Sequence, residues 1–335
     1  MINAYAASTV GAELKPYTYD PGALGPDQVE IAVDYCGICH SDLSVLNNEW
    51  GNAVYPLIPG HEVAGRIVAV GDHVSHRVVG QTVGLGWFSE SCMGCASCMN
   101  GDHNLCAKSE QTIIGRHGGF ADKVRCHWSW AIPLPDALSA LHAGPLFCGG
   151  ITVFNPIVQF GIKPTDKVGV IGIGGLGHMA LQFLNKWGCE VTAFTSTPAK
   201  ADEARGFGAH KIVSSRDDAA LEALAWSLDF ILVTSNVTLN WPLLINALKP
   251  KGRLHVVGAV LQPMAIPAFS LLMGQRSVSA SPLGSPATTA TMLDFCVRHG
   301  IAPQIEEFPM SKVNQAMQHL ADGKARYRVV LKSDF

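Results

Sequence analysis

The chain of 335 residues is long enough for two domains, and its 48% hydrophobic and 15% charged residues exclude an intrinsically disordered protein. Lys and Arg number 24 against 27 Asp and Glu, so the net charge of −3 offers no general attraction for nucleic acid or an anionic membrane. The 34 glycines show no three-residue period and therefore indicate many tight turns.

The N-terminus gives an expectation about the compartment. Residues Met1–Tyr5 lack the basic start and apolar core of a secretory signal. The apolar stretch Val168–Asn185 contains five glycines and His178, which would be unusual in a lipid-facing helix. We therefore expect a cytoplasmic protein without membrane partners, in which disulfides are the least favoured role for the ten cysteines.

The predicted elements change character near residue 150. Before it, β-branched runs at Val29–Val33 and Glu62–Val70 alternate with Gly, Pro and Asp, as in strands joined by turns. After it, strands alternate with helices of roughly ten residues, which indicates βαβ units and a parallel sheet. The predicted strands are Lys167–Ile173, Glu190–Phe194, Asp229–Val233 and Arg253–Gly258, and the helices are His178–Trp187, Ala199–Phe207 and Trp241–Leu248.

The C-terminal segment is predicted to be mixed. Its elements are a helix around Thr288–Arg298, a strand near Gln304–Phe308, a helix over Lys312–Ala321 and a strand at Tyr327–Leu331. No helix pattern follows the last strand, so it could return to pair with the N-terminal domain.

The densest motif consists of Cys92, Cys95, Cys98 and Cys106. Four thiolates at this spacing can close around one tetrahedral Zn²⁺ and leave no open position, so the metal would be structural. An iron–sulfur cluster is the competing hypothesis, but the ferredoxin run carries Pro after its last cysteine, where this chain has Ala107. Four merely buried cysteines are disfavoured by this density, and we predict structural zinc.

A second cysteine motif spans Cys36–Asp42 and is followed by Gly60-His61-Glu62. A redox pair and a haem attachment are alternatives for this spacing, but neither has its usual context here. A catalytic Zn²⁺ needs three protein ligands and one open position. These segments offer one Cys and one His, and Cys148 is a candidate for the third ligand.

A glycine motif, GxGxxG, lies at Gly172, Gly174 and Gly177 and includes Gly175 and Leu176. It follows a predicted strand and opens a predicted helix, which is the context that a dinucleotide-binding turn requires. The helix N-terminus would supply free N–H groups to the pyrophosphate. Dinucleotide binding is therefore favoured over a plain turn.

The next predicted strand indicates which dinucleotide binds. An NAD site usually places Asp or Glu about 20 residues after the glycines. This chain has Thr195, Ser196, Thr197 and Lys200 in that region, with no acid. Hydroxyls and a lysine can bind a 2′-phosphate that an acid would repel, although the same residues can also cap the following helix. We predict NADP(H).

Together these motifs resemble the zinc-dependent medium-chain alcohol dehydrogenases over essentially the whole chain. The segments 55–62 and 324–330 resemble the cinnamyl-alcohol-dehydrogenase-like branch, and within it the bacterial NADPH-dependent broad-range aldehyde reductases. The resemblance implies an α/β fold. A Rossmann doubly wound parallel sheet is expected over residues 147–286, and a β-rich GroES-like catalytic domain over 1–146 and 287–335.

The resemblance also implies a ligand set for the catalytic zinc. Cys39, His61 and Cys148 correspond to its ligands, which leaves Cys36 structural, and Glu62 corresponds to an acid that can approach the metal. Asp42 resembles the carboxylate that orients the histidine, and Ser41 resembles the hydroxyl that contacts the substrate oxygen. His40 and Arg328 are expected to contact the cofactor, and His40, Ser41 and Asp42 form the predicted catalytic group.

Three further positions follow from the same resemblance. Relatives carry a histidine at the outer end of a proton relay where this chain has Ser44. Trp50 and Trp87 lie where relatives line the substrate pocket, although a tryptophan can also simply fill a core. Besides Cys36, the remaining cysteines are expected to be small buried hydrophobes; they are Cys126, Cys189 and Cys296.

The implied activity is reversible hydride transfer between NADP(H) and a small aldehyde or primary alcohol, with two zinc ions per chain. A zinc-free quinone-reductase-like protein is one alternative, disfavoured by the retained ligands. A non-catalytic, zinc-stabilised NADP(H)-binding sensor is another. We also expect a homodimer that forms through edge strands near Ser277–Ser281.

Overall fold

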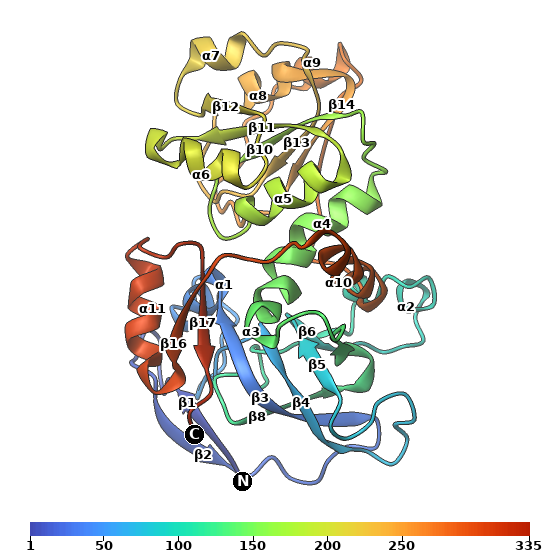
Figure 1. The fold of residues 1–335 in the computed structure, drawn as a ribbon, viewed down its shortest axis with the longest axis vertical. Helices are drawn as coiled ribbons and strands as arrows, with labels where there is room; N and C mark the ends of the chain where they lie inside the picture. The colour runs from blue at the N-terminus through green and yellow to red at the C-terminus, as the bar shows by residue number, and fades with distance from the viewer. The chain divides into compact units, whose positions relative to one another are not determined.

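The computed structural model describes all residues 1–335, and they form two compact units (Figure 1). One unit consists of Met1–Ile151 and Leu283–Phe335, and the other of Thr152–Pro282. The boundaries thus lie within five residues of those expected at 146/147 and 286/287.

The unit Thr152–Pro282 contains a six-stranded sheet in which every pair of neighbours is parallel. The strand order is β12-β11-β10-β13-β14-β15, so the chain changes direction across the sheet between β10 and β13. This is the doubly wound Rossmann arrangement that the sequence predicts. The strands are β10 (Lys167–Ile171), β11 (Glu190–Thr195), β12 (Lys211–Ser214), β13 (Leu228–Val233), β14 (Leu248–Val256) and β15 (Ser277–Ala280).

The helices of this unit connect successive strands. Helix α5 begins at Gly177 and buries Met179, Phe183 and Leu184, then ends where Gly188 takes a left-handed φ of 110° that favours glycine. The other helices are α4 (Gly149–Gln159, which crosses the unit boundary), α6 (Ala201–Gly206), α7 (Asp218–Glu222), α8 (Trp241–Ala247) and α9 (Ala268–Leu272), with a 3₁₀ turn, η4, at Pro198–Lys200.

The predicted elements of this unit lack strands β12 and β15 and helices α4, α7 and α9, although β15 overlaps the segment expected to form an edge. Both strands are short and carry no fully buried residue. Edge strands expose one side and need no strong apolar pattern, so periodicity does not reveal them.

The unit that holds both termini is built on a seven-stranded sheet. Its order is β16-β17-β3-β4-β5-β9, and β8 also pairs with β3. The strands are β3 (Gln28–Ile38), β4 (Val63–Val70), β5 (Thr82–Leu85), β8 (Lys123–His127), β9 (Ile132–Pro133), β16 (Ile305–Pro309) and β17 (Arg328–Lys332), beside the small pairs β1 (Ile2–Ala6) with β2 (Lys15–Tyr19) and β6 (Phe88–Glu90) with β7 (Glu110–Gln111). Helices α1 (His40–Leu46), α2 (Ala96–Met99), α3 (Ala140–Ala143), α10 (Pro286–His299) and α11 (Val313–Ala321) and the 3₁₀ turns η1 (His103–Leu105), η2 (Trp128–Trp130), η3 (Gly144–Phe147) and η5 (Met310–Lys312) complete this unit.

The last strand returns to the N-terminal sheet, as predicted. Strand β17 runs antiparallel to β3, with Val329 opposite Ile38 and Leu331 opposite Cys36. Both strands are largely buried, so the register is held by packing on two sides. This pairing brings the C-terminal segment beside the end of β3, where the motif Cys36–Asp42 lies.

The helices were also compared with the length of a membrane span. No single helix is sufficiently long and apolar to cross a bilayer. The consecutive segments Ala140–Phe147 and Gly149–Gln159 reach that length and composition only when taken together, and they are bent by 57°.

Candidate active site

The first candidate metal centre forms where β3 gives way to α1. Cys39 is the residue before α1, and its backbone N–H donates to Asp42 Oδ2 at 2.9 Å, which closes the first turn of the helix. The motif Cys39-His40-Ser41-Asp42 therefore folds locally so that the cysteine side chain stands at the start of the helix. The carboxylate of Asp42 is fully buried.

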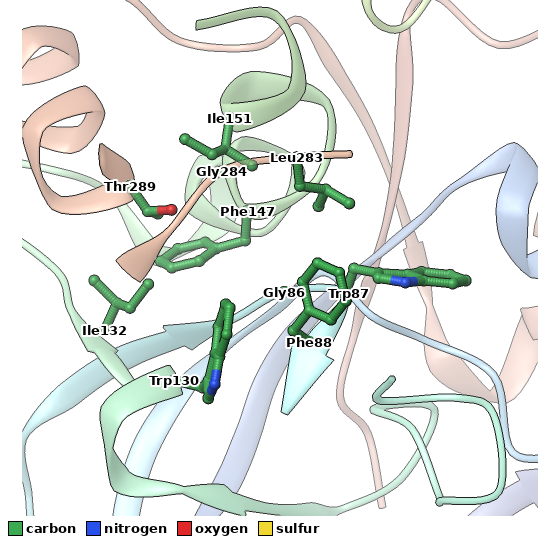
Figure 2. Close-up of a pocket in the computed structure, with 10 residues that line it drawn as sticks. All are labelled: Gly86, Trp87, Phe88, Trp130, Ile132, Phe147, Ile151, Leu283, Gly284 and Thr289. Atoms are coloured by element: carbon green, nitrogen blue, oxygen red, sulfur yellow. The ribbon is translucent and has the colours of Figure 1, made fainter. Parts of the chain in front are cut away.

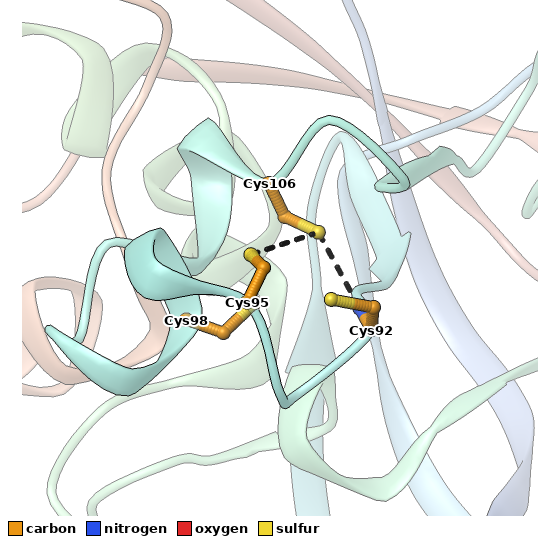
Figure 3. A group of neighbouring side chains, drawn as sticks. All are labelled: Cys92, Cys95, Cys98 and Cys106. Atoms are coloured by element: carbon orange, nitrogen blue, oxygen red, sulfur yellow. Dashed lines mark hydrogen bonds between the residues drawn. The ribbon is translucent and has the colours of Figure 1, made fainter.

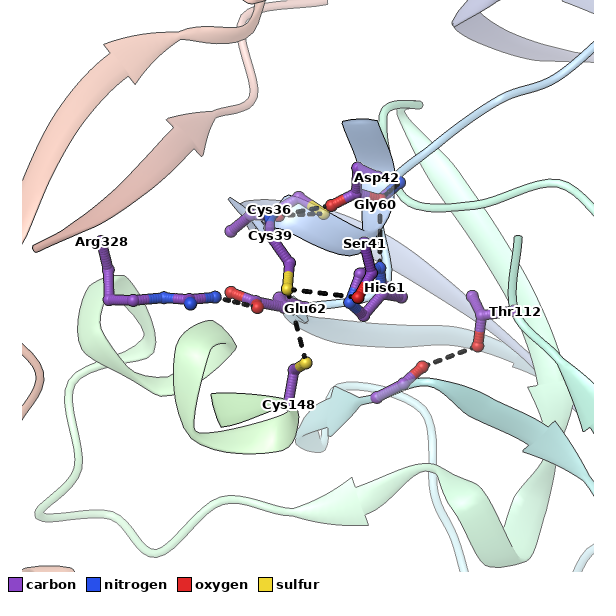
Figure 4. Close-up of polar contacts among 12 residues, drawn as sticks. Cys36, Cys39, Ser41, Asp42, Gly60, His61, Glu62, Thr112, Cys148 and Arg328 are labelled. Atoms are coloured by element: carbon purple, nitrogen blue, oxygen red, sulfur yellow. Dashed lines mark hydrogen bonds and ion pairs between the residues drawn. The ribbon is translucent and has the colours of Figure 1, made fainter. Parts of the chain in front are cut away.

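Asp42 also orients His61, the histidine of the segment Gly60-His61-Glu62. Its Oδ1 atom lies 3.0 Å from His61 Nδ1 and accepts the Gly60 backbone N–H at 2.8 Å (Figure 4). Because a carboxylate only accepts hydrogen bonds, His61 carries its proton on Nδ1 and presents an Nε2 lone pair. That Nε2 atom is buried and has no hydrogen-bond partner.

Four potential ligands surround that nitrogen. The ligand atoms of Cys39, His61, Glu62 and Cys148 all lie within 4.8 Å of one another, and all four residues are buried. The two cysteine Sγ atoms are 3.8 Å apart. An unpaired imidazole nitrogen beside two buried thiols is the donor set that Zn²⁺ prefers, so these residues fit a catalytic zinc ion.

The pKa values of the cysteines and the histidine in this cluster are shifted far from their usual values. The contact with Cys148 lowers the pKa of Cys39, and the same contact raises the pKa of Cys148, because one proton between the two sulfurs is more stable than none. Burial alone would lower the pKa of His61, but the Asp42 carboxylate and Cys39 together raise it above its usual value. The thiols and the imidazole thus share protons with one another, and a metal ion that binds these ligands would displace those protons.

Glu62 is paired with a residue from the last strand. Arg328, the first residue of β17, donates to Glu62 Oε1, and both side chains are buried (Figure 4). Burial raises the pKa of Glu62 to about 7, although the arginine opposes the shift. Oε2 of Glu62 is buried and has no hydrogen-bond partner, so one carboxylate oxygen is unpaired.

The other predicted residues of α1 differ in how deeply they are buried. Ser41 is half-buried, with its hydroxyl 3.7 Å from the Cys39 sulfur, and His40 is exposed. Ser44, at the expected histidine position, is buried and donates to Glu49 Oε2 at 2.7 Å. The structure therefore places Ser41 next to the cluster and gives Ser44 a carboxylate partner that the sequence analysis did not identify.

Tryptophans form a wall beside the metal cluster. The ring of Trp87 meets that of His61 edge-on, with centroids 4.9 Å apart, and Trp50 packs edge-on against Trp87 at 5.8 Å. Trp87 also lines a small apolar pocket in the same unit (Figure 2). The other lining residues are Gly86, Phe88, Trp130, Ile132, Phe147, Ile151, Leu283, Gly284 and Thr289.

The four-cysteine loop forms a second candidate metal centre. The sulfurs of Cys92, Cys95, Cys98 and Cys106 lie within 4.8 Å of one another (Figure 3). The Cys106 sulfur accepts backbone N–H groups from Cys92 at 3.5 Å and Lys108 at 3.4 Å. Such N–H groups stabilise thiolates, and those of Gly94 and Cys95 help lower the pKa of Cys92 to about 6. Four converging sulfurs fit a structural zinc ion.

The glycine turn lies in the other unit, between β10 and α5. Gly172 has a φ of 90°, and a Cβ on Gly177 would lie 1.9 Å from the Gly172 carbonyl oxygen. A Cβ on Gly174 would meet no protein atom within 4 Å. Two glycines are therefore required by the turn itself, whereas Gly174 keeps the backbone accessible for a ligand.

A cavity of about 380 Å³ lies at the carboxyl ends of β10, β11 and β13, next to this turn. Its lining includes the predicted residues Thr195, Ser196, Thr197 and Lys200. The Thr195 hydroxyl accepts the Thr197 backbone N–H at 3.1 Å, and Lys200 Nζ donates to the carbonyl of Ile173 at 3.0 Å. The loop after β11 is thus tied to the glycine turn, with its hydroxyls and ammonium beside one cavity.

Comparisons with known proteins match two segments of the chain to described families. A family described as the alcohol dehydrogenase GroES-like domain matches residues 25–136, and one described as zinc-binding dehydrogenase matches residues 175–298. The chain is 56% identical to aldehyde reductase AdhA from Synechocystis over 99% of this chain and 98% of that protein. It is 40% identical to a probable cinnamyl alcohol dehydrogenase, 8D, from Oryza sativa, over 98% and 93% of the two chains.

Solved structures of similar fold include alcohol dehydrogenases as well. Cinnamyl alcohol dehydrogenase SbCAD4 from Sorghum bicolor superposes with a TM-score of 0.94 at 38% identity, covering 99% of this chain and 97% of that one. A cinnamyl alcohol dehydrogenase from Helicobacter pylori, solved with NADP(H), gives a TM-score of 0.90 at 30% identity with the same coverage.

Proposed function

Since this chain belongs to the zinc-dependent medium-chain alcohol dehydrogenases, in their cinnamyl-alcohol-dehydrogenase-like branch, we propose that it reduces aldehydes reversibly to primary alcohols with NADPH. The similarity to known proteins and the two ligand clusters identify an NAD(P)-dependent aldehyde reductase or alcohol dehydrogenase with two candidate zinc sites. The observation that carries the proposal is the unpaired His61 Nε2 beside the sulfurs of Cys39 and Cys148.

The proposed ligands have distinct tasks. Cys39, His61 and Cys148 would hold the catalytic zinc, and two thiolates with a neutral imidazole would balance its charge. Asp42 keeps the proton of His61 on Nδ1 and so fixes which nitrogen faces the metal. When bound, zinc polarises the carbonyl oxygen and the reduced nicotinamide supplies the hydride. Cys92, Cys95, Cys98 and Cys106 would hold the structural zinc.

Ser41 is the proposed proton donor to the substrate oxygen. Its hydroxyl lies beside Cys39 and is half-buried, so it can contact both a substrate in the site and a proton source outside it. Trp87 would exclude water from the metal, and together with Trp50 it would form an apolar wall for the substrate.

The cofactor would bind across the glycine turn. The pyrophosphate would meet the N-terminus of α5 at Gly174, Gly175 and Leu176, with Gly172 and Gly177 shaping the turn. His40 and Arg328 remain proposed cofactor contacts; His40 is exposed, and Arg328 also has a structural task as the partner of Glu62. The hydroxyls after β11 and Lys200 would favour NADPH over NADH.

A steady-state panel of aldehydes with both cofactors tests this function. We expect zinc-dependent oxidation of NADPH, with a kcat/KM at least about tenfold above that for NADH. Removal of the catalytic zinc ion alone should abolish turnover, and added Zn²⁺ should restore it. A non-catalytic NADP(H)-binding protein would bind the cofactor but oxidise none with any aldehyde, and equal values for both cofactors would reject the NADPH preference.

We also propose a homodimer that forms through the edge strand β15. Strand β15 is the last strand of the sheet, and the segment just before it in the chain exposes Phe269, Leu272 and Met273 by 70%, 69% and 67% of their surfaces. An open strand edge next to exposed apolar side chains is a typical pairing surface. Sedimentation analysis of the parent chain should give a dimer, and Phe269→Glu should shift it toward the monomer.

A cytoplasmic location is the remaining proposal. None of the ten cysteines is paired in a disulfide, and the proposed zinc ligands among them need the reduced state that a reducing compartment maintains. Cell fractionation that recovers the protein from the cytoplasmic fraction would support it, and recovery from the periplasm or the medium would reject it.

A further inference from the structure

Arg216 lines the cavity next to the glycine turn, in the segment that follows β12, and no sequence motif points to it. Strands β11 and β12 are parallel neighbours, with Thr195 opposite Ser214, so both strands end at the same edge of the sheet. The backbone N–H of Ser215 donates to the carbonyl of Thr195 at 3.1 Å. The segments that follow the two strands are therefore fixed side by side, and both line the cavity.

All the charged side chains that line the cavity are positive. Lys200 and Arg216 are the cations that line the cavity, and no Asp or Glu lines it. The nearest acids along the chain already accept hydrogen bonds: Asp217 Oδ1 accepts the Ala220 backbone N–H at 3.1 Å, and Asp218 Oδ1 accepts from the lining residue Asn240 at 3.3 Å. An anion entering here meets two cations and several hydroxyls without a competing carboxylate.

The two cations differ in what they already contact. The ammonium of Lys200 donates to the carbonyl of Ile173 in the glycine turn. Arg216 is exposed and its guanidinium forms no hydrogen bond or ion pair, whereas its backbone N–H donates to the Ser214 hydroxyl at 3.3 Å. A guanidinium on an anchored backbone can turn into the cavity and bind two phosphate oxygens at once.

We propose that Arg216 determines cofactor selectivity by binding the 2′-phosphate of NADP(H) from the β12 side, while Lys200 and the hydroxyls of Ser196 and Thr197 bind it from the β11 side. This inference rests on the proposed NADPH-dependent function and adds a residue to it. Stacking of the guanidinium on the adenine ring is the competing role, and it would stabilise NADPH and NADH alike.

Binding of nucleotide fragments separates these roles without any turnover. Isothermal titration of the holoenzyme with 2′,5′-ADP and with 5′-AMP measures the contribution of the 2′-phosphate directly. We expect Arg216→Gln to weaken 2′,5′-ADP about tenfold and 5′-AMP less than about twofold. Arg216→Lys should recover part of the loss, because it retains the charge but not the fork of donors.

A matched control removes the same charge elsewhere. Arg298 is an exposed arginine near the C-terminal end of α10, in the other compact unit, and contacts no other side chain. Arg298→Gln should bind both fragments like the parent. The NADPH-to-NADH ratio of kcat/KM should fall about tenfold in Arg216→Gln and remain at the parent value in Arg298→Gln.

Each outcome has one meaning. If Arg216→Gln weakens both fragments equally, the guanidinium stacks on the base and the proposal is wrong. If this variant binds both like the parent, Arg216 has no role in binding, and the proposal is equally wrong. If the parent itself does not distinguish 2′,5′-ADP from 5′-AMP, the proposed NADPH preference fails first, and the selectivity assigned to Arg216 fails with it.

Discussion

Asp42 is the single residue on which the geometry of the metal cluster depends most. It is fully buried, and its two carboxylate oxygens contact Cys39, Gly60 and His61. Cys39 and His61 are proposed ligands alongside Cys148, and Gly60 precedes the histidine. One side chain therefore fixes the positions of both ligands and the tautomer of the imidazole.

Asp42→Asn should test this role with little change in volume. The amide retains one acceptor oxygen but places donor hydrogens against N–H groups, so the His61 orientation is lost. We expect the affinity for the catalytic zinc to fall about 10- to 100-fold, measured by competition with a chelator. The structural zinc provides the internal control, because its four ligands lie in another loop. Unchanged affinity at both sites would show that Asp42 does not orient the ligand.

The glycines of the cofactor turn should differ sharply from one another. Gly177→Ala places a Cβ 1.9 Å from a backbone oxygen, so it should destabilise the fold by at least about 2 kcal/mol. Gly174→Ala meets no protein atom and should unfold like the parent while it weakens NADP⁺ binding. Denaturant unfolding and cofactor titration check both. Equal stabilities of the two variants would contradict the packing argument.

Among the elements, β14 and β15 are joined by an unusual side-chain link. His255 on β14 is buried, with Nδ1 2.9 Å from the Ser279 hydroxyl and Nε2 2.9 Å from that of Ser281. Burial, aided by the charge of Arg253, lowers the pKa of His255 to about 4. The neutral imidazole thus fastens the edge strand to the sheet.

This link predicts a loss of stability in acid. Between the unfolded pKa of 6.5 and the folded value of about 4, the unfolded chain binds a proton at His255 that the folded chain does not bind. The stabilisation is complete above pH 6.5 and declines as the pH falls toward 4. Between pH 7 and pH 5 the cost is on the order of 1 kcal/mol.

Unfolding of the parent and of His255→Gln at several pH values checks this prediction. The variant should be less stable at pH 7, but it should lose less stability than the parent on acidification, because glutamine does not titrate. Parallel stability curves for the two proteins would exclude His255 as the source.

At the scale of the whole molecule, the sequence predicts those sites whose residues all lie within one short segment of the chain. The glycine turn and the four-cysteine loop are local, so spacing alone indicates their chemistry. Cys148 is 109 positions from Cys39, and Arg328 is 266 positions from Glu62. Spacing cannot reveal such pairs: the family resemblance supplied Cys148, and the partner of Glu62 became visible only with the fold.

The cavity next to the glycine turn also combines residues that the sequence predicts with a residue that it does not. The loop after β11 was found because it follows a strongly apolar strand. Strand β12 has four residues and no fully buried side chain, so the sequence analysis missed both this strand and Arg216 after it. Short edge strands are held by their neighbours rather than by their own pattern, and the residues beyond them become visible only with the fold.

The most direct test of the central claim compares two cysteines of one motif. Cys36 and Cys39 are both buried, but only Cys39 belongs to the ligand cluster, while the Cys36 thiol donates to the backbone carbonyl of Gly37. Zinc content and NADPH-dependent aldehyde reduction should be measured together for Cys36→Ser and Cys39→Ser. We predict two zinc ions per chain and near-parent turnover for the first variant, and one zinc ion with at least about a hundredfold slower turnover for the second. A Cys39→Ser protein that retained two zinc ions and the parent rate would contradict the proposed active site.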